Sequence, residues 1–146
     1  MRVYLDNCSL QRPLDSRTRT RVILEAEAIL SVLTFLESGR IELVSSEALL
    51  FEINRDPDIA RREYALEVLS KAQSFVRVND RVEKRAAGFV AMGLKPLDAL
   101  HLASAEEARA DCFCTCDDRF LGKAKVLAGL TTRVVSPVEL IEELEQ

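Results

Sequence analysis

The sequence predicts an α/β fold in three layers, an α/β/α sandwich in which helices cover both faces of a central parallel sheet of about five strands. Short apolar runs alternate with stretches of helical periodicity along the whole sequence. This alternation is typical of parallel strands joined by crossover helices. The length of 146 residues suits one ordinary domain. Because no repeat or linker interrupts the pattern, we expect a single domain over residues 1–146.

The first third of the chain predicts two strands and two helices. Apolar residues 3–5 form a first strand that ends at Asp6, and residues 7–20 are polar and predict a loop or an irregular helix start. Apolar residues then recur at helical spacing over 22–37, and Gly39 is a natural stop for that helix. A second strand follows at 41–44. Ser45 and Ser46 are both N-cap candidates for a helix that reaches about residue 53.

The remaining elements follow from the same signals. Asp56 and Pro57 read as an N-cap and a first-turn proline of a helix that reaches about residue 73. Ser136, Pro137 and Glu139 form a capping-box pattern that begins a last, acidic helix. Between these two signals we expect a strand at 75–78, helices at 80–93 and 96–110, a strand at 112–115, a short helix after residue 117 and a strand at 133–135.

Composition and charge exclude several classes of protein. Hydrophobic residues make up 48% of the chain and charged residues 30%, which is too apolar for a disordered protein. A net charge of −4 argues against a generally basic nucleic-acid coat protein. No apolar run approaches the roughly 18 residues that a membrane span needs, and the N-terminus lacks a signal-peptide layout. We therefore expect a cytoplasmic protein with no membrane partner.

Carboxylates stand where a ligand site is expected in such a fold. Asp6 follows the first strand, Asp117 follows the fourth, Asp98 lies in the first turn of the helix before the fourth, and Glu52 lies late in the helix after the second. Parallel strands end at one edge of the sheet, and ligands bind along that edge. No glycine-rich phosphate loop is present. We therefore expect the four carboxylates to share one cleft there.

Four carboxylates in one cleft predict a divalent cation. Like charges raise one another's pKa, and a cation removes that cost. Oxygen ligands suit Mg²⁺ or Mn²⁺, which can polarise a phosphoryl oxygen and activate water. Taken singly, most of these residues have an ordinary alternative as a surface or cap residue. Asp6 is the exception, because a charge directly after a buried strand needs a reason.

Three segments resemble the acidic blocks of the PIN domain family. They are residues 3–8, 96–105 and 115–120, which stand in the family's order, and the D-A-L-H-L-A run at 98–103 with the T-x-D at 115–117 is the most specific part. Taken as a whole, the sequence resembles the VapC-type toxins of prokaryotic toxin–antitoxin pairs and their stand-alone relatives.

The resemblance implies a metal-dependent nuclease, acting mostly on RNA. It maps the acidic residues onto Asp6, Glu52, Asp98 and Asp117. Asp6, Asp98 and Asp117 would hold Mg²⁺ or Mn²⁺ directly or through water, while Glu52 would hold a second metal or orient the attacking water. Glu47 remains an alternative to Glu52, and Asp118 to Asp117.

Basic residues near the expected cleft suggest how RNA could be held. Arg12 and Arg17 belong to a basic segment after the first strand, and Arg119 follows Asp117; arginine forks suit phosphate groups. Their alternative is a solvated helix surface. His101, the only histidine, is interpreted as a structural hydrogen-bonding residue. The resemblance further implies a small antitoxin partner, if the protein is a toxin, and a homodimer.

Two other functions remain open at this stage. One is a catalytically degenerate PIN module that only binds RNA or protein. The other is a phosphatase with an aspartate nucleophile at Asp6, although that chemistry requires a second Asp two residues on, where Cys8 stands.

Overall fold

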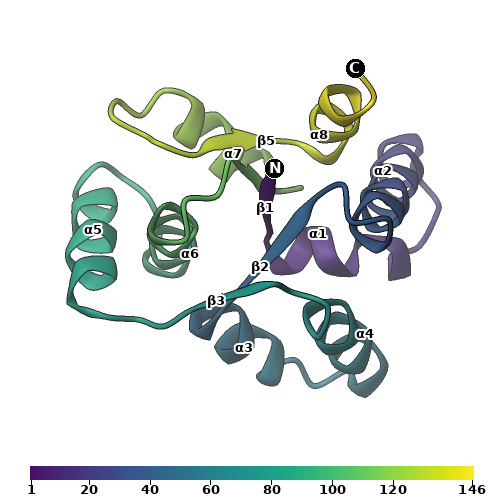
Figure 1. The fold of residues 1–146 in the computed structure, drawn as a ribbon, viewed down its shortest axis with the longest axis horizontal. Coiled ribbons are helices and arrows are strands. Elements are labelled where there is room, and N and C mark those ends of the chain that lie inside the picture. The colour runs from purple at the N-terminus through teal and green to yellow at the C-terminus, as the bar shows by residue number, and fades with distance from the viewer.

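Five short parallel strands form one sheet in the order β3-β2-β1-β4-β5 in the computed structural model, which describes residues 1–146 (Figure 1). The strands are β1 (Arg2–Leu5), β2 (Glu42–Ser46), β3 (Ser74–Val76), β4 (Cys112–Cys114) and β5 (Arg133–Val135). Tyr4 of the central strand β1 lies in register with Val44 of β2 and Phe113 of β4. The predicted parallel sheet of five strands is therefore confirmed.

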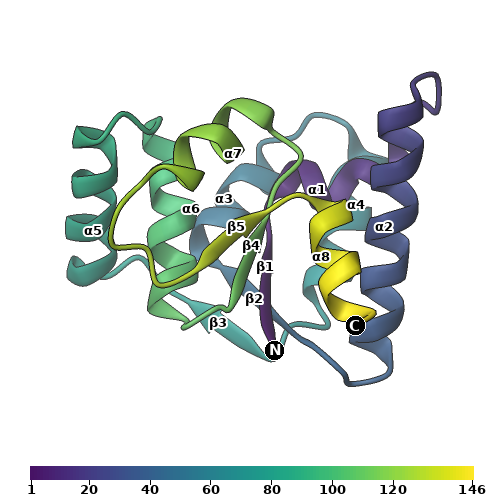
Figure 2. The same cartoon turned by 90° about the horizontal axis from the view of Figure 1, so that it is seen from above.

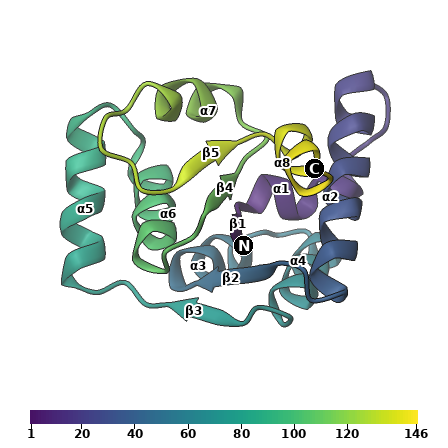
Figure 3. The same cartoon turned by 45° about the horizontal axis from the view of Figure 1, so that its top comes forward.

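Helices cover both faces of this sheet. They are α1 (Asn7–Gln11), the 3₁₀ turn η1 (Arg12–Leu14), α2 (Thr20–Glu37), α3 (Glu47–Asn54), α4 (Ile59–Leu69), α5 (Asp80–Ala91), α6 (Pro96–Glu107), α7 (Asp118–Lys125) and α8 (Pro137–Leu144). Helices α5 and α6 pack together on one side, and α2 and α8 pack together on the other (Figures 1 and 3). This is the predicted α/β/α sandwich. None of the helices combines the length and the apolar character needed to cross a membrane.

The core is centred on β1 and β4. Val3, Tyr4 and Leu5 are buried on both faces of the sheet, as expected for the middle strand of a parallel sheet. The ring of Tyr4 stacks on Phe113 with centroids 4.9 Å apart, and Phe113 meets Phe120 of α7 edge to face at 5.1 Å. These aromatic contacts hold the ends of β1 and β4 close to the start of α7.

Several helix boundaries agree with the cap signals in the sequence. Ser46 caps α3 by accepting a hydrogen bond from the backbone N–H of Leu49. Ser136 and Glu139 form the predicted capping box of α8. Gly39 follows the end of α2 with a φ of +78°, a left-handed conformation that glycine adopts without strain.

The prediction that Asp56 and Pro57 begin a helix was wrong. Helix α4 begins at Ile59, and its N-cap is Asp58, whose side chain accepts from Arg61 N. Asp56 instead accepts from the N–H of Asp58 and from the side chain of Gln11, which places Pro57 before the cap. The helix also ends earlier, at Leu69 rather than near residue 73.

Residues 7–20, expected to be a loop or an irregular helix start, contain the short helix α1 and the turn η1. Helix α1 begins directly after β1, because the Asp6 carboxylate caps it. The N-terminus lies at one end of the sheet, while α1 and α7 begin at the opposite end, where the strands finish (Figure 2). The turns that follow β1 and β4 therefore meet at one edge.

Candidate active site

One pocket of about 190 Å³ at this sheet edge is lined by all four predicted carboxylates, Asp6, Glu52, Asp98 and Asp117. They come from the end of β1, from α3, from the first turn of α6 and from the turn before α7. The remaining lining residues are Asn7, Cys8, Arg12, His101, Phe113 and Cys116. The fold thus brings together side chains that lie up to 111 positions apart in the sequence.

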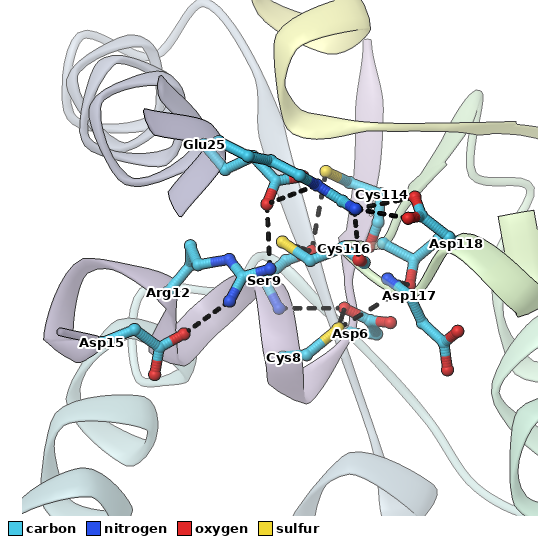
Figure 4. Close-up of polar contacts among 12 residues, drawn as sticks. Asp6, Cys8, Ser9, Arg12, Asp15, Glu25, Cys114, Cys116, Asp117 and Asp118 are labelled. Atoms are coloured by element: carbon cyan, nitrogen blue, oxygen red, sulfur yellow. Dashed lines mark hydrogen bonds and ion pairs between the residues drawn. The ribbon is translucent and has the colours of Figure 1, made fainter. Parts of the chain in front are cut away.

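Asp6 is the most buried of the four carboxylates. Its Oδ1 accepts hydrogen bonds from the N–H of Ser9 at 3.0 Å and from the thiol of Cys8 at 3.1 Å (Figure 4). Burial raises the pKa of Asp6, while hydrogen bonds from Thr115, Cys8 and Ser9 lower it in part. A carboxylate in this setting favours either a proton or a bound cation.

Asp117 is the N-cap of α7 and remains exposed. Its Oδ1 accepts from the N–H groups of Arg119 and Phe120 at 2.9 and 3.2 Å, and its own N–H donates to the hydroxyl of Thr115 at 3.0 Å. The turn therefore holds the Asp117 side chain at the pocket by local hydrogen bonds, which a T-x-D sequence can supply.

The pKa of Asp98 depends on the charges of the other carboxylates. It is half-buried in the first turn of α6. Burial raises its pKa most, and the negative charges of Asp117 and Asp6 raise it further, against the opposing charge of Lys95. The three aspartates are thus electrostatically coupled across the pocket.

Glu52 faces the pocket from α3, and its Oε1 lies 2.7 Å from Nε2 of His101. The two alternatives left open by the sequence lie elsewhere. Glu47 accepts from the N–H of Val78, and Asp118 is paired with Arg21. Neither lines the pocket.

The three predicted RNA-binding arginines differ in their freedom to bind a phosphate. Arg12 lines the pocket, but its terminal nitrogens contact Asp15 and Glu25, each at 2.8 Å (Figure 4). Arg17 pairs with Glu27 at 2.8 Å and lies outside the pocket. Arg119 is exposed and makes no ion pair. Binding of RNA by these residues stays a prediction.

The residues present fit a hydrated, hard cation better than a closed metal cage. No three His, Cys, Asp or Glu side chains lie close enough together to hold an ion directly. However, Oδ1 of Asn7 is buried at the pocket without a hydrogen-bond partner. Mg²⁺ commonly keeps several waters and takes only one or two carboxylates directly. The unpartnered oxygen of Asn7 would then add an acceptor beside the carboxylates for such a hydrated cation.

Part of this environment was not predicted from the sequence. Asn7, Cys116 and Phe113 line the pocket, and Tyr4 and Ser46 connect to it through hydrogen bonds with His101 and with each other. A tyrosine inside a central apolar strand was the available signal, because a buried hydroxyl requires a partner.

Comparison with known families shows that residues 4–126 match the PIN domain. The chain belongs to the PIN domain family. The matched segment includes all four carboxylates of the pocket and ends before β5 and α8. The predicted family is therefore confirmed.

Solved structures include a similar fold. The PIN domain described here resembles a chain in a crystal structure of VapBC2 from Rickettsia felis bound to a DNA fragment from its promoter, with a TM-score of 0.60 and 8% sequence identity. The alignment covers 93% of this chain and 98% of the other. At this identity the likeness is one of fold. No curated protein sequence matches the chain.

Proposed function

We propose that this PIN domain is a metal-dependent endoribonuclease that hydrolyses RNA phosphodiester bonds. The observation that carries the proposal is the meeting of Asp6, Glu52, Asp98 and Asp117 in one pocket where the strands end. Membership of a family associated with nucleases supports the same reaction. A binding module would not need four carboxylates whose charges oppose one another.

Each carboxylate has a role that follows from its position. Asp6, Asp98 and Asp117 would hold Mg²⁺ or Mn²⁺ together, at least one of them through water. When bound, the cation would polarise the phosphoryl group and make water more acidic. Glu52, held at Oε1 by His101, keeps Oε2 free to accept a hydrogen bond from the attacking water. By resemblance to the family, we expect products with a 5′-phosphate and a 3′-hydroxyl.

RNA would approach along the rim next to Asp117. Arg119 is the predicted contact that is free to bind a phosphate, since it is exposed and makes no ion pair. Arg12 would act from the pocket wall while paired with Glu25, and Arg17 would have to exchange Glu27 for a phosphate. Because these are charge contacts, affinity for RNA should fall as salt rises.

We also propose that the protein is the toxin of a toxin–antitoxin pair and acts in the cytoplasm. The support is the shared fold with a chain of a VapBC complex. A small antitoxin that covers the pocket is the partner proposed on that basis, and a homodimer of this chain is proposed by resemblance to the family.

The deciding experiment is a cleavage assay on mixed RNAs with Mn²⁺, with and without a chelator. Asp6→Asn and Asp117→Asn should each lower the cleavage rate by at least about 10²-fold, since each removes a carboxylate that would hold the cation on which the transition state depends. Asp118→Asn is the matched control for Asp117→Asn, because Asp118 lies outside the pocket, and it should cleave normally.

Three results would count against the proposal. Undiminished cleavage by Asp6→Asn would refute the site, and cleavage that survives the chelator would refute the metal requirement. RNA binding without cleavage by the wild type would favour the degenerate module. A phosphorylated Asp6 trapped during turnover would instead revive the phosphatase.

A further inference from the structure

A series of short hydrogen bonds runs from the pocket into the core. Oε1 of Glu52 lies 2.7 Å from Nε2 of His101, and Nδ1 of His101 lies 2.6 Å from the hydroxyl of Tyr4. That hydroxyl lies 2.7 Å from Oγ of Ser46, which accepts from the N–H of Leu49 at 3.0 Å. We call the four linked side chains, Glu52, His101, Tyr4 and Ser46, the relay.

The relay has one direction in which every donor finds an acceptor. A carboxylate only accepts hydrogen bonds, so Nε2 of His101 carries a hydrogen and donates it in the bond to Glu52. Ser46 accepts a hydrogen bond from a backbone N–H, so its own hydroxyl can donate to the oxygen of Tyr4. The Tyr4 hydroxyl then donates to Nδ1 of His101. Burial raises the pKa of Tyr4, which keeps that proton in place. The network therefore assigns the Nε2–H tautomer to the ring.

Three members of the relay are closed off from solvent. Tyr4 and Ser46 are fully buried, and His101 is 2% exposed, whereas the Glu52 side chain is 33% exposed at the pocket. Leaving a buried hydroxyl or ring nitrogen unpaired is costly. A rotation of the His101 ring would unpair Tyr4 and Glu52 together, so the ring is locked in place.

The relay also ties together the elements that carry the carboxylates. Tyr4 stands two residues before Asp6 on β1, and His101 stands one helical turn after Asp98 on α6. Ser46 caps α3, the helix that carries Glu52. Three of the four carboxylates of the pocket therefore lie on or directly after elements that the relay joins to one another.

We propose that His101 is a positioning residue for the proposed reaction, in that it holds the Glu52 carboxylate in the pocket with Oε2 free for water, and that Tyr4 and Ser46 fix the ring that does so. This inference rests on the proposed nuclease function. His101 acts through Glu52 and does not itself contact RNA or metal.

The first test compares two substitutions of His101. The side-chain amide of His101→Gln can reach the Nε2 position and donate to Glu52, whereas that of His101→Asn reaches only the Nδ1 position next to Tyr4. His101→Asn should lower kcat by about 10- to 100-fold with little change in KM, the usual cost of losing such a supporting contact. His101→Gln should stay within about threefold of the wild type, and thermal melting should show both variants to be folded.

A double-mutant cycle separates positioning from a general effect on folding. If His101 acts through Glu52, then His101→Asn should cost less than about twofold once Glu52→Gln is already present. Equal losses in both backgrounds would overturn the inference while leaving the nuclease function standing. Equal activity of the Asn and Gln variants would overturn it as well.

A second readout needs no activity. His101 is the only histidine in the chain, so its two ring nitrogens give unambiguous signals in a long-range ¹H–¹⁵N NMR spectrum. We expect a protonated Nε2 whose signal shifts in Glu52→Gln and stays in place in Glu47→Gln, a matched control on the same helix. An Nδ1–H ring, or no response to Glu52→Gln, would contradict the relay. If this signal behaves as expected but the wild type cleaves no RNA, the relay is supported and the proposed function fails.

Discussion

Asp6 serves as a helix cap and as a pocket residue at the same time. Its Oδ1 caps α1 through Ser9, while the carboxylate as a whole is buried next to Cys8 and Thr115. Burial raises its pKa, which means that the ionised form costs folding stability. The ionised form of Asp6, which a bound cation would require, therefore weakens the fold in the absence of that cation.

Replacing Asp6 should accordingly stabilise the protein. Asn retains the cap oxygen, so Asp6→Asn should raise Tm at pH 7 in metal-free buffer. A raised folded-state pKa means that the folded protein binds the proton more tightly than the unfolded chain does. The wild type therefore gains stability as the pH falls through the folded-state pKa toward the unfolded value of about 3.9. The difference in Tm between Asp6→Asn and the wild type should then disappear.

Calorimetry between neutral and acidic pH measures this gap. Asp58→Asn is the matched control, since Asp58 is also an N-cap but is exposed on α4, and it should show no such gap. A gap for Asp6→Asn that does not change with pH would exclude relief of the buried charge as its cause.

At the scale of elements, caps place the helices and the helices place the side chains. Ser46 begins α3 and thereby determines where Glu52 falls on that helix, and Asp117 begins α7. Ser136 begins α8, which packs against α2 and β4 away from the pocket. Caps next to the pocket thus influence stability and function together, whereas the cap of α8 should influence stability alone.

Ser136→Ala tests this separation. Loss of the side-chain cap should lower the free energy of unfolding by about 1 kcal/mol, while RNA cleavage stays at the wild-type level under conditions where both proteins are folded. Ser136→Thr keeps the hydroxyl and should behave like the wild type. Urea denaturation gives the comparison, and an unchanged midpoint for Ser136→Ala would show that the capping box in the structure contributes nothing measurable.

At the scale of the molecule, the sheet edge concentrates negative charge that no nearby arginine neutralises. Arg12, the one cationic side chain that lines the pocket, is already paired with Asp15 and Glu25. Repulsion among Asp6, Asp98 and Asp117 therefore persists in the folded protein: burial is the main cause of the raised pKa of Asp98, and the charges of Asp117 and Asp6 raise it further. A cation that binds only the folded state relieves it and stabilises the whole fold.

Mg²⁺ should therefore raise the Tm of the wild type. At a concentration 100-fold above Kd, mass action adds about 2.7 kcal/mol to the free energy of unfolding. The shift should disappear in Asp6→Asn, shrink in Asn7→Ala, and persist in Asp118→Asn. Thermal melts at matched ionic strength measure it, and an equal shift in Asp6→Asn would place the bound cation outside this pocket.

Much of the architecture could be predicted from the sequence, because it is encoded locally. Alternating apolar runs determined the parallel sheet and its helices, and Ser46 and Ser136 marked two helix starts correctly. The start of α4 was missed because Asp56 and Asp58 both carry an N-cap signal beside Pro57. In the structure Asp58 caps the helix, while the Asp56 carboxylate accepts from the N–H of Asp58 and from Gln11, 45 positions away.

The sequence by itself determined which residues stand at the ends of strands, and hence that acidic side chains gather at one edge of the sheet. Only the tertiary structure decided that Glu52 rather than Glu47 faces the pocket, that Arg12 is already paired, and that His101 joins Glu52 to Tyr4. The physical reason is that strand ends follow from local periodicity and the topology of parallel sheets. Side-chain partners such as Tyr4 and His101, which lie 97 positions apart, are chosen only when helices and strands pack together.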